Sequence, residues 1–320
     1  MNSYRDAGTF RTSLLVPIDF GRRLKYVSGM ANTRDVVTPG ACVLADGAWG
    51  TEFQRLGLEA GSPPEHWNLL HPEKVAEVAR SYVDAGARII LTNTFGGSAF
   101  RLARHGLEGS VEEINTVGAE ISKKAAGGRA VVFGSMGPTG KLLCTGEVTQ
   151  DEMYESFHRQ AAALYRGGVD AILIETMIDL EEMRIAASAA QGSTPLPLVL
   201  SMTFDSGKDK TRTMMGVTPE QAVEEMEKLG AWVVGANCGA GPEYYVQVCK
   251  RMRAATAKPI WIKPNAGMPQ MSEHGVTYTQ TPELFGSFAL QLREAGATVI
   301  GGCCGTTPSH IRRLRELLSQ

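Results

Sequence analysis

Residues 197–238, PLVLSMTFDSGKDKTRTMMGVTPEQAVEEMEKLGAWVVGANC, decide the fold. The runs PLVLSMTF and WVVGANC at its two ends are almost continuously apolar, which is typical of strands that are buried on both faces. Between them, TPEQAVEEMEKLG has apolar residues at helical spacing and ends in glycine, a common helix stop. This order of strand, helix and strand predicts a parallel pair joined by a helical crossover.

The same unit recurs along the chain. Eight strand–helix units in about 280 residues match the size of a (β/α)₈ barrel. A doubly wound sheet would usually carry a G-x-G-x-x-G turn after its first strand, and DGAWGTE (46–52) does not fit that pattern. We therefore expect an α/β fold, a single-domain TIM barrel over residues 37–320, preceded by an irregular extension over residues 1–36. The other predicted strands are 42–47, 88–94, 130–137, 170–177, 259–265 and 298–304, and further helices are predicted at 71–86, 149–168, 281–296 and 307–318.

The composition excludes several classes of protein. With 32 basic and 34 acidic residues and a net charge of −2, the chain has no charge excess that favours nucleic acid or a membrane surface. No apolar run reaches the roughly 18 residues of a membrane span. Six cysteines in 320 residues do not form a disulfide scaffold. The N-terminus lacks the apolar core of a secretory signal, and Met30 is an alternative start. We expect a cytoplasmic protein.

Polar residues end most of the apolar strands. In a (β/α)₈ barrel, catalytic groups lie where the strands end and the following loops begin, at one common face. Because these ends meet at one rim, we expect their side chains to form one functional site. The residues are Asp46, Asn93, Ser135, Glu175, Asn237, Cys238, Asn265, Cys303 and Cys304.

Three of these residues are cysteines. Cys238 and the adjacent pair Cys303 and Cys304 end two different strands that a barrel brings to the same rim. Thiolates favour Zn²⁺ over Mg²⁺ or Ca²⁺, and catalytic zinc keeps three protein ligands and one open position. Neighbouring strand residues point to opposite faces, so we expect the flanking glycines to relax the backbone. On spacing alone, separate buried thiols and a strained vicinal disulfide remain alternatives.

An open zinc site has a chemical consequence. A substrate thiol that binds at the fourth position is deprotonated by the charge of the metal. The resulting thiolate is a nucleophile at neutral pH, and thiolates attack carbon well. The predicted chemistry is therefore alkyl transfer to sulfur.

Seven blocks of the sequence are DGAWGTEFQRLG (46–57), TNTFGG (92–97), GPTG (137–140), ET (175–176), GANCGAGP (235–242), NAGMP (265–269) and GGCCGTTPSHI (301–311). Together they resemble the homocysteine S-methyltransferase domain, closest in motif to the homocysteine domain of cobalamin-dependent methionine synthase. The resemblance covers residues 40–318 and implies a zinc-dependent methyltransferase that converts homocysteine to methionine, with Cys238, Cys303 and Cys304 as metal ligands. It also implies that Asp46 and Glu175 lie near the substrate ammonium, and the backbone amides of Gly47 and Ala48 suit the substrate carboxylate.

The resemblance leaves several methyl donors open. Gly96 and Gly97 stand where betaine-dependent relatives carry an aromatic residue, which argues against a betaine cage. The leading interpretation is a methylated corrinoid, methylcobalamin, carried on a separate protein that docks at the barrel mouth. The loops 140–149 and 204–216 are candidate docking surfaces. S-methylmethionine as a small-molecule donor, another thiol as acceptor, and a non-enzymatic zinc-binding partner of a corrinoid protein are the alternatives.

Overall fold

The computed structural model describes residues 33–319 except 39, 41 and 273–274. Most of the predicted extension over residues 1–36, and the alternative start at Met30, lie outside the described residues; Thr33–Val36 form the short helix α1. Within the described part, no helix is long and apolar enough to cross a membrane.

Eight parallel strands form a barrel, as predicted from the sequence. Hydrogen-bonded neighbours run in the order β1-β10-β7-β6-β5-β4-β3-β2. A parallel bridge between Ala45 and Ile89 brings the two ends of this sheet together. The strands are β1 (Val43–Leu44), β2 (Ile89–Leu91), β3 (Val131–Met136), β4 (Ala171–Met177), β5 (Leu198–Met202), β6 (Val233–Cys238), β7 (Ile260–Pro264) and β10 (Val299–Ile300).

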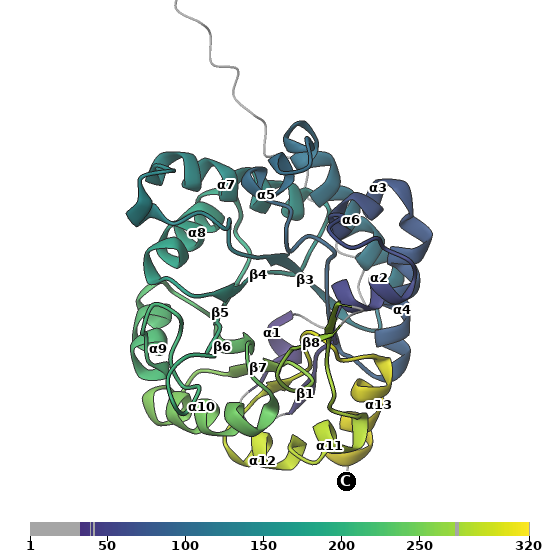
Figure 1. Cartoon of the computed structure of the whole chain (residues 1–320), viewed down its shortest axis with the longest axis vertical. Helices are drawn as coiled ribbons and strands as arrows, with labels where there is room; N and C mark the ends of the chain where they lie inside the picture. The colour runs from purple at the N-terminus through teal and green to yellow at the C-terminus, as the bar shows by residue number, and fades with distance from the viewer. Residues whose placement is uncertain (1–32, 39, 41, 273–274, 320) are drawn as a thin grey trace, which may run out of the picture. The chain divides into compact units, whose positions relative to one another are not determined.

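Helices surround the strands, as the view in Figure 1 shows. Their starts follow ordinary capping chemistry: Thr149 and Thr218 each form a capping box with the residue three positions later. Gly86 ends α4 in the left-handed conformation. The helices after α1 are α2 (Gly50–Arg55), α3 (Trp67–Leu70), α4 (Pro72–Ala85), α5 (Ala99–Ala103), α6 (Val111–Ala126), α7 (Gln150–Arg166), α8 (Leu180–Ser193), α9 (Pro219–Lys228), α10 (Pro242–Ala255), α11 (Pro282–Gly286), α12 (Ala289–Glu294) and α13 (Pro308–Leu318).

Two features differ from the sequence-based expectation. The helix predicted over residues 281–296 is divided into α11 and α12, and the break follows Gly286, a residue that weakens a helix interior. A β-hairpin that the apolar pattern did not reveal, β8 (Gln270–Ser272) with β9 (Gly275–Thr277), lies in the loop after β7. It is too short for the sequence pattern to show a clear strand period.

The interior of the barrel is filled with side chains. One apolar cluster takes residues from all eight barrel strands, and its members alternate along each strand with residues that pack under the helices. Phe133 and Trp261 stack within this cluster with ring centroids 5.9 Å apart, and neither is exposed. This layer closes the barrel below its carboxyl-terminal rim.

The same alternation places polar side chains above the apolar layer. Along β3 the inward series begins with Val131 and Phe133, and along β4 it begins with Ala171 and Leu173. The next position of the same parity on β3 is Ser135 and on β4 is Glu175. Asn237 on β6 and Lys263 on β7 continue their strands in the same way. The inward face therefore changes from apolar to polar at one level of the barrel.

Candidate functional site

A cavity of about 450 Å³ opens at the carboxyl-terminal rim of the barrel. It is the place where the strand ends predicted to carry function come together. The predicted residues that line it are Gly47, Ala48, Asn93, Ser135, Glu175, Cys238, Cys303 and Cys304.

The three predicted cysteines form one cluster at this rim. The Sγ atoms of Cys238, Cys303 and Cys304 all lie within 4.8 Å of one another. Tetrahedral zinc with Zn–S bonds of about 2.3 Å holds its sulfur ligands just under 4 Å apart, so this spacing fits a metal with a small inward adjustment. The cysteines are free thiols in the structure. The cluster can therefore hold a metal ion, and its all-sulfur donor set suits zinc.

The backbone brings the cysteines together only partly by the route expected. Gly301, Gly302 and Gly305 were predicted to adopt conformations closed to other residues; Gly305 does so, with φ of 80°, but Gly301 and Gly302 have no positive φ. A Cβ on Gly301 would lie 2.7 Å from the Asp46 carbonyl oxygen, and one on Gly302 would lie 2.4 Å from the Thr306 side chain. These glycines are needed for close packing. Cys238 itself adopts the left-handed conformation, with φ of 64°, which is unusual for a residue with a side chain.

A methyl group at position 301 should therefore damage the cysteine cluster. We expect Gly301→Ala to lower the free energy of unfolding by about 1–3 kcal/mol, because the added atom forces the last barrel strand away from the strand end at Asp46. The variant should also bind less zinc per chain. Thermal unfolding and metal analysis measure the two effects. Gly109→Ala is the matched control, since nothing lies within 4 Å of its added Cβ; equal losses in both variants would contradict the packing argument.

Hydrogen bonds within the cluster favour one thiolate. The bonds that Cys304 receives from Cys238 and Cys303 hold its pKa well below the usual range, although burial opposes this. The bond between Cys238 and Cys303, together with burial, raises the pKa of the Cys238 thiol. A cation bound among the three sulfurs would take the place of the protons that they hold.

Glu175 faces the same cavity from β4. Its Oε1 accepts a hydrogen bond from Ser135 Oγ (2.5 Å), and its Oε2 accepts one from Asn237 Nδ2 (3.2 Å). Burial raises the pKa of this carboxyl to about 7, and the positive charge of Lys263 opposes that rise. Thr176, the next residue, has φ of 62° and lies at a register shift in the strand. A buried carboxyl that titrates near neutrality is a common feature of functional sites.

Asp46 lies at the end of β1 and has no exposed surface. Its Oδ2 accepts hydrogen bonds from Trp49 Nε1 (2.7 Å) and from the Leu91 backbone amide (2.7 Å). Its Oδ1 pairs with Lys263 Nζ. Both carboxylate oxygens are therefore occupied by protein groups, and Asp46 contacts the site through Lys263.

The remaining predicted polar residues hold the rim together. Asn93 Nδ2 donates to Pro64 O (2.7 Å), and Asn265 Nδ2 donates to Gly239 O (2.7 Å), so both fix loop backbone. Asn237 also donates to Thr176 Oγ1 (2.7 Å). The Ala48 amide, expected to be open to a ligand, donates to Thr306 Oγ1 (3.1 Å).

Sequence reasoning did not single out Lys263, Tyr278 or Thr306, which border or support the cavity. Lys263 had a detectable signal, because a lysine inside the apolar run PIWIKPN is expensive to bury without a function or a partner. Tyr278 follows the hairpin and hydrogen-bonds to Cys304. No local pattern in the sequence marks that contact.

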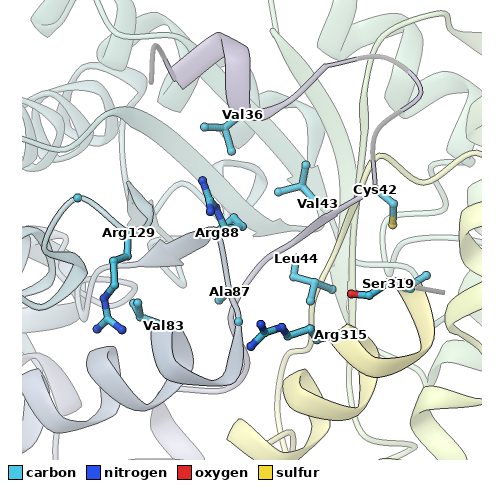
Figure 2. A pocket seen from close by; sticks show the side chains of 13 residues that line it. Val36, Cys42, Val43, Leu44, Val83, Ala87, Arg88, Arg129, Arg315 and Ser319 are labelled. Carbon is cyan, nitrogen blue, oxygen red and sulfur yellow. The ribbon is translucent and has the colours of Figure 1, made fainter. Parts of the chain in front are cut away.

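A second cavity, of about 590 Å³, lies near the amino-terminal ends of β1 and β2. Arg88, Arg129 and Arg315 line it, but in Figure 2 the Arg88 guanidinium points away from the other two. Arg129 pairs with Asp84 at 2.7 Å, and both side chains are exposed. These charges do not converge on a common point, so the smaller cavity at the rim is the candidate site.

The chain is similar in sequence to known proteins over most of its length. A family model described as homocysteine S-methyltransferase matches residues 43–318. The chain is 30% identical over 299 residues to methionine synthase of Mycobacterium leprae, which covers 87% of this chain and 24% of that protein. It is also 30% identical over 293 residues to methionine synthase of Mycobacterium tuberculosis, and this alignment covers 85% of this chain and 24% of that protein. The chain thus spans about a quarter of the length of these relatives.

Solved structures share the fold. The oxidised and metallated forms of the homocysteine methyltransferase MmuM from Escherichia coli each superpose with a TM-score of 0.73 at 23% identity. The alignment covers 86% of this chain in both cases, and 95% and 96% of the two MmuM chains. At this identity the likeness concerns the barrel alone.

Proposed function

The chain belongs to the homocysteine S-methyltransferase family, and we propose that it methylates the sulfur of L-homocysteine at a zinc ion held by Cys238, Cys303 and Cys304, giving methionine. The observation that carries this proposal is the cluster of three thiols, with Sγ atoms within 4.8 Å, in the same cavity as Glu175. When zinc is bound, coordination keeps a substrate thiol as the thiolate at neutral pH.

The residues of the cavity bind and orient the acceptor in this proposal. Glu175 takes the substrate ammonium, since its carboxylate lines the cavity and is held in place by Ser135 and Asn237. Gly47 lines the cavity, and its backbone amide is proposed to bind the substrate carboxylate. Holding the sulfur in line with the methyl donor turns an encounter of two molecules into an oriented reaction. The carbon–sulfur bond forms as the bond from the methyl group to the donor breaks.

A methylated corrinoid on a separate protein is the proposed donor. Its support is the similarity to methionine synthases, of which this chain covers about a quarter. Met214 and Met215 in the predicted docking loop are 68% and 48% exposed, which suits contact with a partner. Glu65 binds the Gly96 amide at 2.6 Å and lies within 3 Å of where a Cβ on Gly96 would be. The aromatic residue that betaine-dependent relatives carry near this position would have no room beside Glu65.

One observation favours a second class of donor. Trp49, Phe95 and Tyr278 all line the cavity. Aromatic rings bind sulfonium and quaternary ammonium cations through their negative faces. S-methylmethionine is therefore the alternative donor, and it would need no partner protein.

Methionine formation from homocysteine with different donors tests the proposal. The zinc-loaded chain is offered methylcobalamin, S-methylmethionine, betaine and methyl-folate in parallel, and product is measured by mass spectrometry. We expect methionine with methylcobalamin, at least to a low level without the carrier protein. Methionine from S-methylmethionine alone would replace the proposed donor with the alternative. If no donor yields methionine, including a corrinoid protein loaded with methylcobalamin, the proposed function is wrong.

A further inference from the structure

Lys263 is a buried lysine in the wall of the cavity. It extends from β7 with only 2% of its side chain exposed. Its Nζ pairs with Asp46 Oδ1 and lies 5.4 Å from the centre of the Trp261 ring. Lysine is rarely buried to this degree, because its charge loses contact with water.

The carboxylate of Asp46 satisfies only part of this lysine. An ammonium group has three N–H donors, and within the described part of the chain Lys263 donates one hydrogen bond, to Asp46. Asp46 in turn accepts hydrogen bonds from Lys263, Trp49 and the Leu91 amide, and it does not line the cavity. The pair therefore presents the spare donors of Lys263 to the cavity.

The negative and positive side chains of the cavity come from two different strands. Glu175, from β4, supplies a carboxylate that takes a cation, while Lys263, from β7, supplies a cation whose charge acts on both Glu175 and Cys303. An amino acid carries one group of each sign. The arrangement matches a zwitterion, with opposite charges facing different strands.

We propose that Lys263 recognises the anionic group of the acceptor thiol, so that the enzyme selects thiols that bear a carboxylate and Asp46 serves to position the Lys263 ammonium. This inference rests on the proposed function. It assigns the substrate ammonium to Glu175, because Asp46 is paired with Lys263 and does not line the cavity. It also predicts that a thiol without an ammonium still binds, provided that it carries a negative charge.

The alternative is that Lys263 is only a buried counter-ion for Asp46. A buried pair of this kind often gains no more stability than an apolar pair of similar volume. A purely structural lysine would affect all ligands equally. Selectivity between charged acceptors therefore separates the two roles.

Binding of three thiols to the zinc-loaded chain tests the proposal without any methyl donor. They are homocysteine, 4-mercaptobutyrate, which lacks the ammonium, and 3-aminopropane-1-thiol, which lacks the carboxylate. Calorimetry gives the three Kd values. In the unmodified protein, loss of the carboxylate should weaken binding by about 10- to 100-fold, the usual range for a hydrogen bond to a charged group. If the thiol without a carboxylate binds as tightly as homocysteine, the proposal is overturned.

The variant Lys263→Met should erase this preference. We expect homocysteine and 3-aminopropane-1-thiol to bind it with Kd values within about threefold of each other, whereas Lys263→Arg keeps the preference because it keeps the charge. Lys258→Met is the matched control: Lys258 precedes β7, at the opposite end of the same strand, and donates to the Ala231 carbonyl at 2.7 Å. A uniform loss of affinity for all three thiols in Lys263→Met would assign a structural role. If that variant does not fold, the comparison in the unmodified protein decides alone.

The outcomes separate this inference from the proposed function. Methionine formation without any preference for a carboxylate overturns only the role of Lys263. A clear preference for carboxylate-bearing thiols without methionine formation from any donor overturns only the methyl transfer. Failure of all three thiols to bind overturns both.

Discussion

Cys303→Ala should lose bound zinc and methionine formation together. The three Sγ atoms lie within 4.8 Å of one another, and the cluster is the only group of at least three Cys, His, Asp or Glu side chains with such spacing among the described residues. Removing one thiolate leaves two ligands, too few for a stable catalytic zinc site. We expect the zinc content to fall from about one per chain to near zero and turnover to fall by at least roughly 1,000-fold, because the acceptor thiol then keeps its proton. Metal analysis and the methionine assay on one preparation measure both.

The control for this variant is Cys144→Ser. Cys144 is an exposed cysteine in the loop between β3 and α7, away from the cluster. Because this loop is also a candidate docking surface, activity is measured with free methylcobalamin, and the variant should keep both zinc and activity. Full turnover of Cys303→Ala in chelator-treated buffer would show that methyl transfer does not depend on the cysteine cluster, and the proposed mechanism would be abandoned.

Glu175→Gln should lower kcat/KM for homocysteine by roughly 30-fold or more. The ionised carboxylate is the group proposed to bind the substrate ammonium, and breaking one partner of a buried charge pair costs about 2–5 kcal/mol, or 1.4 kcal/mol for each factor of ten. The loss should be much smaller for 4-mercaptobutyrate, which has no ammonium. Initial rates with the two thiols measure the difference.

The raised pKa of Glu175 adds a pH dependence. Its value of about 7 in the free protein means that the carboxyl is mostly protonated at pH 6 and mostly ionised at pH 8. The kcat/KM for homocysteine should therefore rise across this range in the unmodified enzyme, and this rise should be absent in Glu175→Gln.

Glu182→Gln is the matched control. Glu182 is another buried carboxylate, but it bonds to the Thr139 amide (2.7 Å) and does not line the cavity. It should lower stability without changing the ratio between the two thiols. An identical pH profile in the unmodified enzyme and in Glu175→Gln would remove Glu175 from ammonium binding.

Much of the barrel was predictable because it depends on local patterns. Each predicted strand contains a barrel strand, since buried parallel strands need continuous apolar runs, and these runs stand out between amphipathic helices. The meeting of Cys238 with Cys303 and Cys304 followed from topology alone, because strand ends share one rim. The alternation of inward-facing and outward-facing residues along β3 and β4, which places Ser135 and Glu175 inward, also follows from the residue spacing.

Other parts of the site depend on long-range contacts that no local pattern records. Asp46 was expected to be open to substrate, and only the fold reveals that Lys263, 217 residues later, occupies it. The role of Gly301 was misjudged for the same reason. A side chain at this position would clash with the Asp46 carbonyl oxygen on the neighbouring strand, so only glycine fits. The left-handed backbone of Cys238 likewise has no signature in the residues around it.

The stacked pair of Phe133 and Trp261 has a kinetic consequence. Because this layer fills the barrel below the cavity, the cavity opens at the rim, and the proposed acceptor and donor would both approach from there. A large donor at the rim blocks the way to the cysteine cluster. In the proposed reaction, the acceptor therefore binds before such a donor arrives, and the methylated product leaves after the spent donor has departed. The packed layer below the cavity, whose side chains take no part in the proposed chemistry, would thereby set the order of substrate addition.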